Sequence, residues 1–126
     1  MAVGKTKLSN VSALIEYLDS ASNATSEDNV TAAAPTIYQL KTNNSGNAAA
    51  VYTKIWDNAA PTVGTTAPNW ILKVKASGTL KMTVARSDAA GGARMQTALS
   101  FATVTTAGTA GTTNPTTAPS VAIIAV

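Results

Sequence analysis

The sequence contains neither cysteine nor histidine. The absence of cysteine excludes disulfide bonds and a thiolate nucleophile, and the absence of histidine excludes an imidazole general base. Zinc sites built from these ligands and catalytic triads that need a histidine are therefore excluded as well. Glu27, Asp28 and Asp19 are the carboxylates that could in principle hold a calcium ion, but their spacing matches no calcium-binding loop. We accordingly expect no catalytic residue, no metal site and no cofactor, and a protein that is not an enzyme.

Charged and aromatic residues are also scarce. They make up 12% and 5% of the 126 residues, whereas apolar residues make up 45%. A chain of this length and apolar content can bury the core of one domain. Its surface must then consist mainly of Thr, Ser, Asn, Gln and Ala, which suits β-structure and close contacts between subunits.

Positive and negative charges are unevenly distributed along the chain. Residues 1–34 hold two lysines and four carboxylates, a net charge of −2, whereas residues 35–126 have a net charge of +5. The lysines stand singly between apolar residues, as on a solvated strand face, and no basic cluster alternates with aromatic residues. We therefore expect no nucleic-acid partner. No apolar run has the length of a signal peptide or a membrane span, so we also expect no membrane partner.

The N-terminal stretch has the spacing of an amphipathic helix. Four apolar residues follow the i, i+3, i+4, i+7 pattern: Val11, Leu14, Ile15 and Leu18. The pattern predicts a short helix over Ser9–Ser22, followed by a polar loop over residues 21–31. A stripe this narrow cannot form a core of its own. We therefore predict that residues 1–34 form an arm and linker, and that the four apolar residues bind a neighbouring subunit.

From Pro35 onward apolar and polar residues alternate, which is typical of β-strands. Strands are expected at residues 36–41, 49–56, 70–75, 80–84, 95–104 and 120–126. Turn residues separate these strands at intervals that are typical of a β-sandwich sequence. We expect residues 35–126 to form a mainly β domain, a jelly-roll-like or immunoglobulin-like β-sandwich of six to eight short antiparallel strands. The short turn at residues 76–78 predicts that the third and fourth strands form a hairpin.

Two tryptophans and two arginines are further candidates for a subunit interface, where both residue types are enriched. Trp56 and Trp70 flank a long Pro/Gly-containing loop, and Arg86 and Arg94 flank a glycine-rich loop. Each pair also has a simpler interpretation. The tryptophans would then cap the ends of the core, and the arginines would be solvated loop residues.

One strand and loop resemble a known group of proteins. The run AAAVYTKIWDNAAPTVGTTAP at residues 48–68, followed by WILKV at residues 70–74, is similar to a strand and loop in small virion proteins of tailed bacteriophages. The later segment GARMQTALSFA at residues 92–102 and the Thr/Ala/Gly-rich tail resemble these proteins as well. The resemblance covers residues 35–119. It implies a β-sandwich located in the virion.

The leading hypothesis from this resemblance is a capsid cement or decoration protein that binds the major capsid protein and other copies of itself. A trimer is the preferred oligomer because it fits the threefold positions of a capsid. A collar, tail or fibre component is the alternative with the same fold. A third hypothesis, of another class, is a carbohydrate-binding module that uses Trp56 or Trp70 as a stacking platform.

Overall fold

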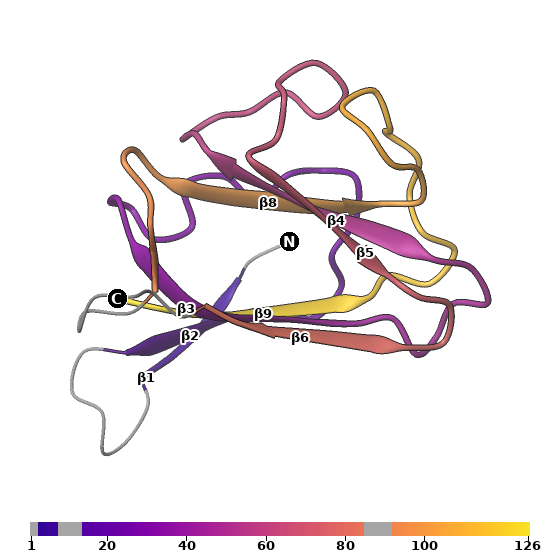
Figure 1. Cartoon of the computed structure of the whole chain (residues 1–126), viewed down its shortest axis with the longest axis horizontal. Coiled ribbons are helices and arrows are strands. Elements are labelled where there is room, and N and C mark those ends of the chain that lie inside the picture. The colour runs from indigo at the N-terminus through magenta and orange to yellow at the C-terminus, as the bar shows by residue number, and fades with distance from the viewer. Residues whose placement is uncertain (1–2, 8–13, 85–91) are drawn as a thin grey trace.

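The chain folds into two antiparallel β-sheets that face each other (Figure 1). The structure is a computed structural model and describes residues 3–7, 14–84 and 92–126. Nine strands lie within these ranges: β1 (Gly4–Lys7), β2 (Ile15–Asp19), β3 (Thr36–Asn43), β4 (Val51–Asp57), β5 (Trp70–Val74), β6 (Thr79–Thr83), β7 (Ala93–Arg94), β8 (Leu99–Val104) and β9 (Ser120–Ala125). The expected mainly β fold of two antiparallel sheets is confirmed.

The two sheets differ in size. The larger sheet has six strands in the order β1-β2-β9-β3-β6, with the short β7 also paired to β3. The smaller sheet has three strands in the order β5-β4-β8. The last strand of the chain, β9, therefore lies in the middle of the larger sheet, and β4 lies in the middle of the smaller one.

The predicted N-terminal helix is wrong for the residues that the structure describes. Ile15–Asp19 form strand β2, which pairs with β1 on one side and with β9 on the other. Residues 9–13 of the predicted helix lie outside the described residues. Along β2, Tyr17 and Asp19 are buried and Leu18 is exposed. Two flanking strands provide backbone partners for this short segment, and sheet pairing overrides the weak helical spacing.

The predicted hairpin between the third and fourth expected strands is also wrong. β5 pairs with β4 in the smaller sheet, whereas β6 pairs with β3 in the larger sheet. The turn over residues 75–78 therefore crosses from one sheet to the other. Ser77 has a positive φ of 52° in this turn, the left-handed conformation that permits a sharp change of direction. Because of this crossing, the apolar faces of β5 and β6 line the same interior from opposite sheets.

Two buried asparagines hold this corner together. The Asn44 side-chain amide donates to the carbonyl oxygens of Ala49 and Lys75, both at 3.0 Å. The Asn47 amide donates to the Asn44 side-chain oxygen at 2.7 Å and to the Thr117 carbonyl oxygen at 2.6 Å. The pair therefore links the turn after β3, the crossing after β5 and the loop before β9.

The hydrophobic core lies between the two sheets. Its fully buried side chains include Ile37, Leu40, Ile55, Phe101 and Ile123. A polar contact also joins the sheets, because the buried hydroxyls of Thr42 on β3 and Thr53 on β4 are hydrogen-bonded at 2.9 Å. Buried hydroxyls that satisfy each other in this way fix the position of one sheet over the other.

The polar run predicted as a loop lies along the edge of β8. The backbones of Glu27 and Phe101 exchange two hydrogen bonds of 2.8 and 3.1 Å, and the Val30 amide donates to the Leu99 carbonyl oxygen at 2.8 Å. The Val30 side chain belongs to the core cluster. The segment 23–30 therefore closes one long side of the sandwich. The division of the chain at residue 34 into an arm and a separate sandwich domain stays a prediction.

Deletion of residues 1–30 tests this division. It removes β2 from the side of β9 and the segment 23–30 from the edge of β8, so core side chains such as Phe101 become accessible to water. We expect the cooperative thermal transition to be lost, because the exposed apolar area no longer contributes to stability. Circular dichroism measures this transition.

Deletion of residues 1–13 is the matched control for this experiment. It leaves β2 and the segment 23–30 in place, and the thermal transition should be kept. If the longer deletion also leaves the melting temperature unchanged, residues 35–126 fold alone and the sequence-based division is right.

Candidate functional site

The apolar residues of the predicted N-terminal stripe do not share one surface. Val11 lies outside the described residues, and Leu14 and Ile15 are half-buried. Ile15 packs against the core cluster. Leu18 is 39% exposed and faces outward from β2. Among the described members of this set, Leu18 is the one most open to a partner.

The tryptophans and arginines predicted for an interface are also spread over the molecule. Arg86 lies outside the described residues, and Arg94 is exposed on β7. Trp56 is fully buried in β4. Trp70 is half-buried on the edge strand β5. Trp56 is therefore out of reach of a partner, whereas Trp70 is partly accessible.

Trp56 is buried on the outer side of the smaller sheet, under the loop of residues 58–69. Its indole Nε1–H donates to the Thr66 carbonyl oxygen at 2.9 Å. The long loop of residues 105–119 touches this first loop, because a Cβ atom on Gly64 would come within 2.5 Å of the Thr112 side chain. Figure 1 shows both loops above the smaller sheet. The chain's own loops therefore cover the outer face of this sheet over β4, whereas Ile71 on the neighbouring β5 is exposed.

Lys54 is fully buried on the same side of β4 as Trp56. Its ammonium group donates to the carbonyl oxygens of Thr109 at 3.0 Å and Gly111 at 2.7 Å. Burial lowers the pKa of Lys54 below its ordinary value of 10.5, because the charged form loses its hydration. The two carbonyl oxygens replace part of that hydration and tie the second loop to the sheet. The sequence pattern predicts a solvated lysine at this position, and that prediction is wrong.

Asp57 at the end of β4 binds a third segment of the chain. One carboxylate oxygen accepts a hydrogen bond from the Gln96 amide at 2.7 Å, and the other accepts from the Thr97 and Ala98 amides at 2.7 and 3.1 Å. Burial raises the pKa of Asp57, but the three amide donors together outweigh this and the pKa lies below its ordinary value of 3.8. The carboxylate thus fixes the turn between β7 and β8.

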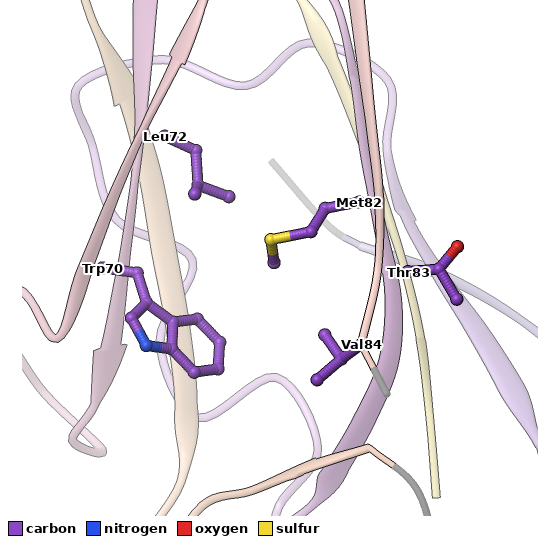
Figure 2. Close-up of a pocket in the computed structure, with 5 residues that line it drawn as sticks. All are labelled: Trp70, Leu72, Met82, Thr83 and Val84. Atoms are coloured by element: carbon purple, nitrogen blue, oxygen red, sulfur yellow. The ribbon is translucent and has the colours of Figure 1, made fainter. Parts of the chain in front are cut away.

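An apolar pocket opens between the edge strands β5 and β6. It has a volume of about 340 Å³ and is lined by Trp70, Leu72, Met82, Thr83 and Val84. Figure 2 shows Trp70 and Leu72 facing Met82 and Val84 across the gap, while Thr83 points away. No strand in the described part of the chain pairs with the outer edges of β5 and β6. This side of the sandwich is therefore open, in contrast to the β8 side.

The outer face of the larger sheet is the second open surface. Leu18 on β2, Lys41 on β3 and Lys81 on β6 are exposed on it, and Ala122 and Ile124 on β9 are partly exposed. Figure 1 shows no described segment over this face, which lies at the bottom of the view. The two faces of the sandwich thus differ, since loops bury the central strand of the smaller sheet and no described segment covers the larger sheet.

The described residues contain no group of three or more His, Cys, Asp or Glu side chains that could hold a metal ion. Nor is any helix within these ranges long and apolar enough to span a membrane. Asp19 and Glu27 are near each other, and burial raises the pKa of both, with a further contribution from the Asp19 charge at Glu27.

The sequence did not single out Lys41, Lys81 or Ile124 as interface candidates. Alternation along each strand indicates that these side chains point outward. Their meeting with Leu18 on one face depends on β9 lying between β2 and β3, and no local pattern reveals that order. Predicting this shared face from the sequence would therefore have required the order of the strands in the sheet.

Comparison with known proteins gives no match. No protein-family model matches the chain, and neither a curated protein nor a solved structure does.

Replacing Asp57 by asparagine tests its role as an anchor. The amide group of asparagine cannot accept hydrogen bonds from all three backbone amides, so we expect Asp57→Asn to lower the free energy of unfolding by about 1–3 kcal/mol at neutral pH. Because the pKa of the folded carboxyl lies below 3.8, its contribution is full above that pH and is lost as the pH falls further. The difference between variant and wild type should therefore shrink as the pH falls below 3.8.

Urea unfolding at neutral and acidic pH measures both effects. Asp28→Asn is the control, since it removes the same charge from an exposed residue. It should change the free energy of unfolding little at either pH. Equal stabilities of Asp57→Asn and wild type at neutral pH would contradict the anchoring role.

Proposed function

We propose that this chain is a structural protein of a tailed-phage virion, a cement or decoration protein of the head. It would act through contacts with the major capsid protein and with other copies of itself. The observation that carries the proposal is that the segments resembling phage virion proteins pack together as one unit. β4 and the loop after it contact the segment 92–102 through Asp57 and contact the tail through Lys54.

The polar side chains of this unit bind the chain's own backbone. Lys54 and Trp56 donate to loop carbonyl oxygens, and Asp57 accepts from loop amides. The long loops are thereby held against the smaller sheet. This arrangement favours a rigid scaffold whose outer surfaces make the functional contacts, which is what a cement protein requires.

Two open surfaces provide places for such contacts. They are the apolar pocket between β5 and β6 and the outer face of the larger sheet. Partly exposed apolar residues next to polar ones are typical of subunit interfaces. In this proposal the domain is a β-sandwich of jelly-roll-like or immunoglobulin-like type, and a trimer fits threefold positions of the head.

A carbohydrate-binding function is not supported by the tryptophans. Trp56 is fully buried, and Trp70 faces the pocket between the sheets (Figure 2). A sugar therefore cannot reach Trp56, and Trp70 is only partly accessible to one. We therefore do not propose this function.

Antibody labelling of purified phage particles tests the proposed function. Particles from the source of this sequence are labelled with gold-coupled antibody against the chain and viewed by electron microscopy. We expect label over the whole head, because a cement protein is present in many copies on the capsid surface. Label confined to the neck or tail would assign the chain to a collar, tail or fibre instead. Particles without the chain would contradict a virion role.

A further inference from the structure

The outer face of the larger sheet carries an ordered arrangement of charge. Leu18 on β2, Ala122 on β9, Lys41 on β3 and Lys81 on β6 are successive partners across four strands. We call this set row one. The next row along the strands, row two, consists of Glu16, Ile124, Gln39 and Thr83. All eight side chains point outward, because they alternate with residues that face the interior; at Gln39 this neighbour is Leu40, since the register shifts by one residue at Tyr38.

The two lysines of row one repel each other. Lys41 and Lys81 are directly opposite in an antiparallel pair and both are exposed. Like charges in this position destabilise a sheet. The described residues provide no carboxylate that pairs with either lysine, so the sheet contains a repulsion that nothing within the described chain offsets. A carboxylate supplied by a partner on this face would relieve it.

The same face holds such a carboxylate on its other side. Glu16 lies on β2, and Lys41 lies on β3, with β9 between them. Ala122 and Ile124 on β9 and Leu18 on β2 form an apolar strip between the acid and the lysines. The face is therefore acidic on one side, apolar in the middle and basic on the other side.

This order makes the face complementary to itself. If a second copy is turned over about an axis along β9, its β2 lies over the first copy's β3. Glu16 of each copy then lies one row from Lys41 of the other, roughly 7 Å along the strand, a distance that a lysine side chain spans. Both charge pairs form at once, and the apolar strips meet in the middle, as in other two-fold contacts.

We propose that the outer face of the larger sheet is a docking surface for a second copy of this chain, packed face to face about a two-fold axis along β9. Sheets pack in this aligned way in β-sandwiches. A purely acidic partner fits less well, because it would leave Glu16 facing a like charge. The proposal rests on the proposed function: it adds a two-fold contact between copies, separate from the threefold contacts within a trimer.

Charge reversal with restoration tests the docking surface. The mass of the full chain in solution is measured by analytical ultracentrifugation over a concentration series. We expect wild type to associate in pairs, and association to weaken with rising salt. Glu16→Lys and Lys41→Glu should each weaken association by about 10-fold or more, because each change places like charges together. The double variant Glu16→Lys/Lys41→Glu should restore it, since the pairs re-form with their signs exchanged.

Two controls separate docking from folding. Lys73→Glu makes the same charge change on an exposed residue of the smaller sheet, and it should leave association unchanged. Lys41→Glu also removes the repulsion with Lys81, so its melting temperature should not fall below that of wild type. A loss of association in this variant is then not a loss of folding.

Three results would overturn the proposal. They are a wild type that stays monomeric at every concentration, an association that the single reversals leave unchanged, and a double variant that fails to regain association. A monomeric wild type would leave the virion role standing, because antibody labelling of particles tests that role independently.

Discussion

The central strand of the smaller sheet is buried on both faces, and much of the structure follows from this. Val51, Thr53 and Ile55 face the core, while Lys54 and Trp56 face the other way and are also fully buried. A buried neutral polar group such as an indole N–H costs roughly 2–7 kcal/mol without a partner in an apolar environment, and a buried ammonium costs far more. Loop carbonyl oxygens must therefore be brought to β4, and these contacts hold the loops of residues 58–69 and 105–119 in place.

Loops bury the central strand on the outer side of the smaller sheet, so the outer face of the larger sheet is the face more open to a partner. The loops of residues 58–69 and 105–119 occupy the outside of the smaller sheet, and the segment 23–30 occupies the edge of β8. The chain has no comparable described segment over the larger sheet. A protein whose polar residues are engaged on one side and whose apolar side chains are partly open on the other is suited to assembly, and that asymmetry links the fold to the proposed function.

Local alternation was enough to predict most of the strands and the two-sheet fold, because strands such as β5, β6 and β9 alternate between more buried and more exposed side chains. It failed where distant segments decide the outcome. Residues 15–19 have a helical spacing but become a strand because β9, a hundred residues later, pairs with them. The local pattern predicts that Lys54 is solvated. The prediction fails because the residues that bury its side chain, 109–111, lie far away in the sequence. Leu18 was singled out as part of a helical stripe, and it is exposed on a strand instead.

The charges on the open face also limit how copies can meet. An apolar strip such as that of Leu18 and Ile124 would attract many partners if its surroundings were neutral. The uncompensated pair of Lys41 and Lys81 makes contact between two lysine-bearing sides unfavourable, and Glu16 does the same for two acidic sides. Only arrangements that bring β2 of one copy over β3 of another satisfy both conditions. The repulsion between Lys41 and Lys81 destabilises the single chain. In the proposed contact, the same two charges determine how the second copy is oriented.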